Sequence, residues 1–213
     1  MDEYVITLLR HGESFGNANG YYQGQYDFPL TELGRDQAKL LAQRWIREQK
    51  SFDKVISSPL SRARETAEII AKGLNLPLEF DDDWKERNVG ALSGLHEDEA
   101  KQRYPLPEFY TPYSSIVGNG EGDWELFLRA GKALLNLLRR PAGKYLVVSH
   151  GGLLNQAVHA ILETAHRANG QGVKYLFSNT AFSTFIYRPD HFEWTVCGMN
   201  DTAHLTGMEY INE

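Results

Sequence analysis

The chain has 213 residues, which is enough for one fairly large domain with a sizeable core, and we expect a single domain over residues 1–213. Its formal net charge of −6 at pH 7 argues against a broad basic surface for nucleic acid or an anionic membrane, so an anionic ligand would have to be bound locally. The single cysteine, Cys197, excludes an internal disulfide and a cysteine-based zinc site, which agrees with a reducing compartment.

The first predicted strand covers residues 5–9 and ends in a charged cluster. Its apolar run is too short for a signal peptide or a membrane span, so we expect a cytoplasmic protein. The strand is followed by Arg10, His11, Gly12 and Glu13. In open α/β sheets ligands bind at the carboxyl ends of the strands, so this cluster suggests a site. Taken alone, it is equally compatible with a strand that enters a solvated loop.

The next segments alternate between loop, helix and strand. Residues 15–29 are rich in Gly, Asn, Gln and Tyr and predict a long ordered loop. Thr31 is a typical N-cap for an amphipathic helix that reaches about residue 48. A strand over residues 52–57 then ends in SSPLSRARET, and a helix is expected from Pro59 to about Leu74.

The middle of the chain breaks this alternation. A short strand at residues 78–80 is followed by a charged loop, and residues 95–122 contain one short polar helix, expected at 97–104, together with several prolines and aromatic residues. We interpret residues 95–122 as an inserted cap that covers another part of the molecule.

The regular pattern then returns. A strong apolar stripe predicts a helix from about Trp124 to Arg140, and an apolar strand over residues 145–148 ends in Ser149, His150, Gly151 and Gly152. A further helix, a glycine-containing loop and a hairpin with strands at 181–187 and 192–197 complete the chain. The fold class is therefore α/β: a three-layer sandwich with a mainly parallel sheet, helices on both faces and an inserted cap segment.

Three predicted strands thus end in polar motifs, and parallel strands deliver their carboxyl ends to the same edge of a sheet. This arrangement could bring His11 and His150 together with Arg10 and Arg62. Phosphoryl transfer uses such a set, because arginine binds phosphoryl oxygens bidentately, helix N-termini favour anions, and a neutral histidine can act as the nucleophile. A metal site is the alternative use of the two histidines, but neither motif supplies a third ligand, so we expect no metal.

Five segments resemble the histidine phosphatase superfamily, also called the phosphoglycerate mutase-like family. They are LLRHGES with Asn17, YQGQYDFPLTELGRDQA, SSPLSRARETA, KERNVGALSG and VVSHGG, and they occur in this order up to about residue 160. The resemblance implies that His11 is phosphorylated and that Glu86 protonates the leaving oxygen and later activates water. It also implies that Arg10, Arg62 and His150 hold the phosphoryl oxygens. By the same resemblance, the pocket is completed by Asn17, Gln23 and the backbone of Gly24 and Gly151.

Other polar residues near these motifs have simpler interpretations. Glu13 is expected beside the nucleophile's surroundings rather than in the reaction, and Arg87 is expected to be an ion-pair partner. The remaining histidines are expected in core margins or at the surface. They are His159, His166, His191 and His204, while His96 precedes an acidic first helix turn.

The resemblance leaves three activities open: a phosphomonoester hydrolase acting on a small phosphorylated metabolite, a cofactor-dependent phosphoglycerate mutase, and a non-catalytic phosphate-binding protein. The last is disfavoured because both His11 and Glu86 are present. Mutases of the family bind a second anionic group with basic residues of the segment corresponding to 95–122, which here contains five carboxylates against Lys101 and Arg103. The sequence of the ERNVGALSG motif is closer to that of the mutases than to that of the typical phosphatases of the family. We give more weight to charge and to the short chain, and favour a metal-independent hydrolase without a cofactor.

The cap also leads to an expectation about the substrate. Its carboxylates would repel a second phosphate, and its aromatic residues would favour an uncharged, carbohydrate-like or aromatic body. The alternative is that these aromatic residues only pack the cap onto the core. The expected partner is a small phosphate monoester, with no nucleic acid or membrane, and a homodimer is compatible with the sequence.

Overall fold

The computed structural model describes residues 3–115 and 117–207, which form one six-stranded sheet in the order β3-β2-β4-β1-β5-β6. The strands are β1 (Tyr4–Arg10), β2 (Lys54–Ser57), β3 (Leu78–Phe80), β4 (Lys144–Ser149), β5 (Phe182–Arg188) and β6 (Glu193–Asp201). β1, β4, β2 and β3 are parallel, whereas β5 runs antiparallel to β1 and pairs with β6 as an edge hairpin. This topology confirms the predicted mainly parallel sheet.

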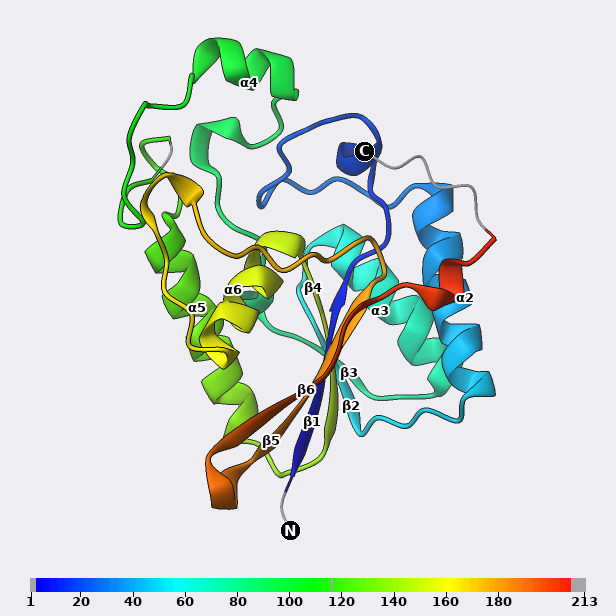
Figure 1. Cartoon of the computed structure of the whole chain (residues 1–213). Coiled ribbons are helices and arrows are strands. Elements are labelled where there is room, and N and C mark those ends of the chain that lie inside the picture. Colours follow the sequence, from blue (N-terminus) through cyan, green and yellow to red (C-terminus); the bar gives the residue numbers. More distant parts are fainter. Residues whose placement is uncertain (1–2, 116, 208–213) are drawn as a thin grey trace.

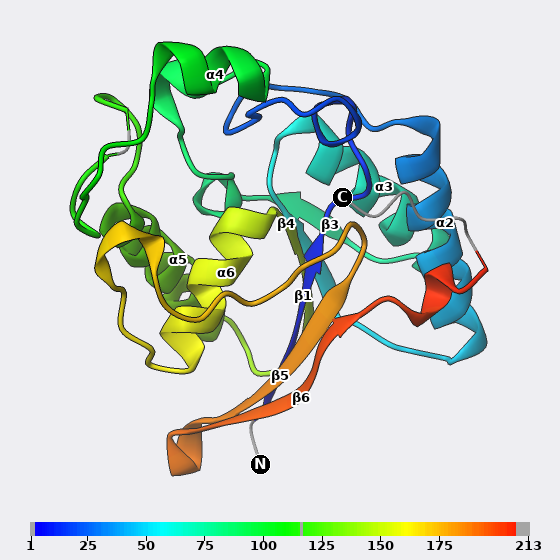
Figure 2. The same cartoon turned by 45° about the horizontal axis from the view of Figure 1, so that its top comes forward.

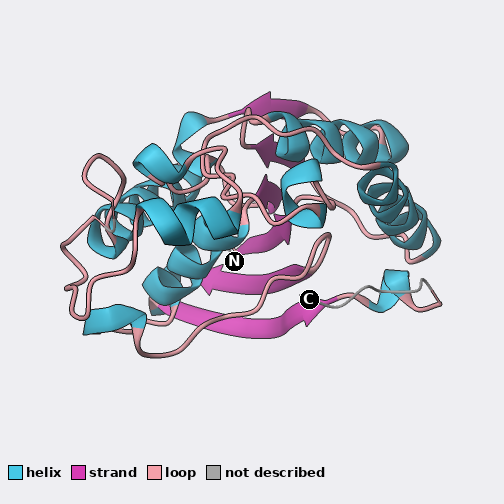
Figure 3. Cartoon of the chain, turned by 90° about the horizontal axis from the view of Figure 1, so that it is seen from above, coloured by secondary structure: helices cyan, strands magenta, loops and turns pink. Residues whose placement is uncertain are grey.

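Helices cover both faces of this sheet (Figures 1 and 3). α2 (Glu32–Arg47) and α3 (Ser61–Leu74) lie on one face, and α5 (Asp123–Leu138) and α6 (Gly151–Ile161) lie on the other. The three-layer sandwich is therefore confirmed. None of the described helices is both long and apolar enough to cross a membrane.

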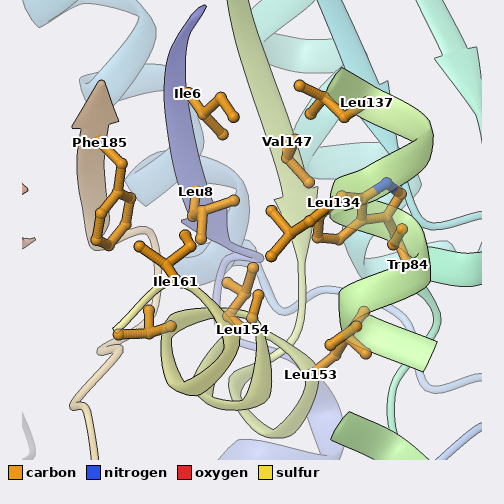
Figure 4. Close-up of a cluster of buried hydrophobic side chains, with 14 of the residues drawn as sticks. Ile6, Leu8, Trp84, Leu134, Leu137, Val147, Leu153, Leu154, Ile161 and Phe185 are labelled. Carbon is orange, nitrogen blue, oxygen red and sulfur yellow. The ribbon is translucent and has the colours of Figure 1, made fainter. Parts of the chain in front are cut away.

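Alternating strand residues supply the two cores between these layers. In β1, Ile6 and Leu8 face α5 and α6, whereas Leu9 faces α2 and α3. Figure 4 shows the first core, in which Val147 of β4 meets Leu134 and Leu154 of the two helices. Both faces are buried, which explains why the central strands read as continuous apolar runs rather than as alternating patterns.

The strands of the parallel part all end at the upper edge in Figure 1, and three irregular segments surround this edge. Figure 2 shows them from the front: the loop after β1, the cap with α4 (Glu97–Arg103), and the yellow to orange segment that follows α6. The last of these, residues 162–181, has little regular structure apart from a 3₁₀ turn, Ala168–Gly170.

Local differences from the sequence predictions have identifiable causes. The predicted loop 15–29 begins with a short helix, α1 (Phe15–Ala18), because Ser14 and Asn17 form a capping box at its N-terminus. The helix expected from Pro59 begins at Ser61. β6 extends to Asp201 rather than residue 197, since register shifts against β5 let pairing continue past the expected end.

Candidate active site

The sheet register brings the two predicted histidines together. Arg10 pairs with Ser149 across β1 and β4, so His11 and His150 leave adjacent strands side by side. Their ring centroids are 5.1 Å apart, and both side chains are buried.

His11 is held in the form that a nucleophile needs. Its Nδ1 lies 2.6 Å from the carbonyl oxygen of Gly12, and because a carbonyl can only accept, Nδ1 carries the proton and Nε2 carries the lone pair. Burial, followed by the charges of Arg62 and Arg10, lowers the pKa of His11 well below its usual value. The ring is therefore neutral at neutral pH.

The backbone around His11 is fixed by close packing. The Gly12 N–H donates to Thr66 Oγ1 at 3.0 Å, and the Asn179 side chain donates to the carbonyl oxygen of His11 at 3.1 Å. A Cβ at position 12 would collide with the carbonyl group of Gly34 in α2. The glycine after the nucleophile is thus required by the approach of a helix.

His150 is oriented by a residue that the sequence analysis did not single out. Its Nε2 lies 2.7 Å from Ser58 Oγ, just beyond β2, and its Nδ1 is a buried nitrogen without a partner among the described residues. Burial lowers the pKa of His150 well below its usual value, and the nearby Arg62, His11 and Arg10 lower it further. When Ser58 donates to Nε2, the proton of the neutral ring lies on Nδ1.

The two arginines hold neighbouring loops and still have unused donors. Arg62, 1% exposed, donates to the carbonyl oxygens of Tyr26 at 3.0 Å and Gly24 at 2.7 Å, and Arg10 donates to that of Phe177 at 2.7 Å. Burial lowers the pKa of both guanidinium groups, that of Arg62 to about 10, so both stay charged at neutral pH. In the described structure, the Nε atoms of both are buried and unpartnered.

Two amide side chains are arranged in a similar way. Asn17 Oδ1 accepts hydrogen bonds from Ser14 and Asn179, and Gln23 Oε1 accepts one from Ser14 Oγ at 2.7 Å. Because the oxygens are used within the protein, the NH₂ groups remain available as donors. Gly24 has φ +48°, and a Cβ there would lie 2.5 Å from Val89 Cγ2, which explains the glycine in this loop.

Glu86 lies at the N-terminus of α6. Its Oε2 accepts from the N–H of Gly152 at 3.0 Å, and its Oε1 accepts from the N–H groups of Leu153 at 3.1 Å and Arg87 at 2.7 Å. A negative charge is favourable at this end of a helix. A Cβ at Gly152 would lie 2.5 Å from Glu86 Oε1, so a glycine is needed for the carboxylate to occupy this place.

One cavity of about 360 Å³, which we call the catalytic cavity, joins these groups. It is lined by eight of the nine residues that the sequence predicted, namely Arg10, His11, Asn17, Gln23, Gly24, Arg62, Glu86 and Gly151, whereas His150 lies beside His11 without lining it. Tyr21, Tyr22, Arg87, Val89 and Gly152 complete the lining.

The side chain of Glu13 does not line this cavity. Its Oε1 accepts from Thr31 Oγ1 at 2.7 Å, at the start of α2. Arg87 forms the expected ion pair, with Asp123 of α5. Asn179 was missed because no local pattern connects it with β1. Ser58, in contrast, stands within the recognised SSPLSR motif and could have been found there.

The site offers nitrogen donors rather than metal ligands. Across the described ranges 3–115 and 117–207, no group of three or more His, Cys, Asp or Glu side chains is placed to hold a metal ion. A buried neutral imidazole that faces cationic and amide donors, with a carboxylate in the same cavity, defines a site suited to binding and transferring a phosphoryl group through histidine.

Comparison with known proteins agrees with this class. The sequence model of the histidine phosphatase superfamily (branch 1) matches residues 6–202, and the chain belongs to this family. It is 36% identical to phosphoglycerate mutase-like protein 4 of Arabidopsis thaliana, over 96% of this chain and 88% of that protein. It is 34% identical to a metal-independent phosphoserine phosphatase of Arabidopsis thaliana, over 97% and 85%.

A solved structure shares both the fold and part of the sequence. It is a variant of a phosphoserine phosphatase from Entamoeba histolytica in complex with phosphoserine, with a TM-score of 0.75 and 26% identity. The match covers 95% of this chain and 99% of that chain. The relatives of this chain thus include both phosphatases and mutase-like proteins, and one is seen with a small phosphate monoester.

Proposed function

We propose that this protein hydrolyses phosphate monoesters of small metabolites through a phosphohistidine at His11. The observation that carries the proposal is the neutral His11 ring, whose Nε2 is free, in one cavity with unpartnered arginine nitrogens and Glu86. The phosphatases among the relatives support hydrolysis as an activity of this family.

The reaction divides into two steps. In the first, His11 Nε2 attacks phosphorus, the bond from phosphorus to the ester oxygen breaks, and protonated Glu86 gives its proton to the leaving oxygen. Arg10, Arg62 and the amide groups of Asn17 and Gln23 stabilise the charge on the phosphoryl oxygens. In the second, the Glu86 carboxylate takes a proton from water, which attacks the phosphohistidine and releases inorganic phosphate.

Trapping the phosphoenzyme tests this proposal. After brief exposure to a ³²P-labelled monoester, the protein should carry label that is lost in acid and retained in base, as a phosphohistidine requires. His11→Ala and the milder His11→Asn should carry none, whereas the control His191→Ala, at an exposed hairpin turn, should be labelled normally. Label that persists in both His11 variants would refute the assignment.

A second experiment with the purified protein distinguishes hydrolase activity from mutase activity. The loop sequence KERNVGALSG and the mutase-like relative favour phosphoglycerate mutase as the second candidate. With 3-phosphoglycerate, a hydrolase releases inorganic phosphate and glycerate, whereas a mutase forms 2-phosphoglycerate. Product analysis by phosphorus NMR that shows mainly 2-phosphoglycerate would replace hydrolysis by the mutase activity.

A further inference from the structure

A second cavity adjoins the catalytic cavity. It also has a volume of about 360 Å³, and it lies between α6, the cap and residues 165–174; we call it the side cavity. Arg87, Gly151 and Gly152 line both cavities, so the two share a wall. The side cavity is thus adjacent to the place where the phosphoryl group of a substrate at His11 would lie.

We propose that the side cavity binds the body of an extended, polar phosphate monoester that carries a carboxylate, and that Arg167 and Lys174 bind this carboxylate. The inference rests on the proposed function, because it assigns a substrate class to the same site.

The charges in the side cavity favour an anion. Arg87 and Asp123 pair with each other there, which leaves Arg167 and Lys174 as the remaining full charges among the described residues that line it. Neither of them pairs with a carboxylate in the part of the chain that the structure describes. Burial lowers the pKa of His159 and His166 in this cavity, so both are neutral at neutral pH.

The carboxylates of the cap do not oppose this charge. In α4, Glu97 and Glu99 pair with Lys101 and Arg103, and Glu121 pairs with Arg129 of α5. The expectation that cap carboxylates repel a second phosphate counted charges along the chain without knowing where they lie, and none of these carboxylates lines either cavity.

The floor of the side cavity is polar. Gln156, 6% exposed, holds His166 through its Oε1, which leaves its NH₂ group as a donor. Asn155 donates to the carbonyl oxygen of Tyr175 at 2.5 Å, which leaves its Oδ1 as an acceptor. Such a surface suits a hydroxylated or amide-containing substrate body better than an apolar one, because the Gln156 NH₂ group and the Asn155 Oδ1 can then both form hydrogen bonds.

The cap and residues 165–174 are held together above this floor. Tyr110 N–H donates to Asn169 Oδ1 at 2.8 Å, and Asn169 N–H donates to the carbonyl oxygen of Tyr110, also at 2.8 Å. Of the cap aromatics expected to contact substrate, Tyr110 lines the side cavity, whereas Phe109 is 65% exposed and lines neither cavity. This double link keeps Arg167 and Lys174 next to the cavity.

A carboxylate fits this pair of cations. Arginine can bind a carboxylate bidentately and lysine adds a second positive charge, so the pair supplies enough positive charge for one carboxylate without further cations. The size of the side cavity allows a body longer than three carbons. Substrate pairs that differ only in the carboxylate can therefore reveal its contribution.

The test compares 6-phosphogluconate with glucitol 6-phosphate, which share a six-carbon chain and differ at the carboxylate. We expect kcat/KM about tenfold higher for 6-phosphogluconate at low salt, as two solvent-exposed ion pairs can supply, with the effect in KM. The double variant R167Q/K174Q should lose this preference and keep its activity on glucitol 6-phosphate. The matched control K101Q/R103Q, in α4 outside both cavities, should retain the preference.

Each outcome decides the inference. Equal kcat/KM for both compounds, or an unchanged preference in R167Q/K174Q, would overturn it while leaving hydrolysis intact. A stronger preference for glucitol 1,6-bisphosphate than for 6-phosphogluconate would overturn the carboxylate assignment. Calorimetric binding of both compounds to His11→Asn gives the same comparison without turnover. If no phosphoenzyme forms, the proposed function fails, and the ratio of the two Kd values still tests the side cavity.

Discussion

In the proposed reaction, the carboxyl group of Glu86 acts first as the general acid and then as the general base. It is held by three backbone N–H groups, two of them from the first turn of α6, so its position is set by a helix rather than by a flexible side chain alone. These hydrogen bonds hold the carboxylate in the same cavity as His11.

We predict that Glu86→Gln separates substrates by their leaving groups. A general acid contributes about 10² to 10⁴ in rate, so kcat on alkyl phosphates should fall by that amount. The loss on p-nitrophenyl phosphate should be within about tenfold, because its leaving group needs little protonation. Steady-state kinetics on both substrates would check this. The control Glu13→Gln changes a carboxylate bound to Thr31 outside the cavity. Equal losses on both substrates would contradict the role.

His204 is a residue whose burial links stability to pH. Its Nε2 lies 2.9 Å from Thr180 Oγ1, and burial, with a further contribution from Arg44, lowers its pKa from 6.5 to about 4. Between these two values the unfolded chain binds a proton that the native protein does not. The free energy of unfolding therefore falls as the pH drops through this window.

We predict that His204→Asn reduces this loss of stability. The change in pKa corresponds to at most about 3 kcal/mol, fully lost only near pH 4, and the wild-type protein should lose more stability than the variant between pH 7 and pH 4.5. Urea unfolding at several pH values measures the difference. Parallel stability curves for the two proteins would show that His204 does not carry the effect.

At the scale of elements, Arg129 connects α5 to the loop that carries Glu86. It donates to the carbonyl oxygens of Asp83, Lys85 and Glu86 at 2.6 to 3.0 Å, and it pairs with Glu121. Burial raises the pKa of Glu121, but the hydrogen bonds from Arg129 and from the Asn88 N–H outweigh this and leave it lowered. One side chain thus anchors both the cap end and the catalytic loop.

We predict that Arg129→Met lowers both stability and activity. Removing one partner of a largely buried pair costs about 3 to 5 kcal/mol, and here three carbonyl groups also lose a donor. Thermal unfolding should shift down by roughly 6 to 20 °C. Activity on alkyl phosphates should fall more than activity on aryl phosphates, because the displaced group is Glu86. Lys132→Met, an exposed change one turn along α5, is the control and should shift unfolding by less than about 2 °C.

At the scale of the whole molecule, the chain is negatively charged, but basic side chains gather at its two cavities. The chain carries −6 overall, yet Arg10 and Arg62 lie at the catalytic cavity and Arg167 and Lys174 at the side cavity. In the proposed reaction, Arg10 and Arg62 supply at the phosphoryl group the positive charge that a metal ion provides in metal-dependent phosphoryl transfer.

We predict that activity does not depend on a metal ion. Hydrolysis of p-nitrophenyl phosphate should be unchanged, within about twofold, after dialysis against excess chelator, since arginine donors already balance the phosphoryl charge. Loss of activity that Mg²⁺ or Zn²⁺ restores would contradict it.

The sequence by itself determined the sheet class and most of the catalytic cavity. Each apolar strand stops at its polar motif, and parallel strands end at one edge, so residues far apart in the chain were predicted to meet there. The resemblance supplied Glu86, Asn17 and Gln23, whose loops have no periodicity from which a position could be read.

The tertiary structure decided the tautomers and protonation states of those residues and which segments surround them. The Gly12 carbonyl oxygen fixes the His11 tautomer, Ser58 holds His150, and burial beside two arginines keeps both rings neutral. It also paired Glu97 and Glu99 of the cap with Lys101 and Arg103, and it brought residues 165–174 to the side cavity. Local sequence patterns encode which face of a helix or strand is buried. Contacts between irregular segments depend instead on how the helices and strands pack, because this packing sets the positions of the loops that connect them.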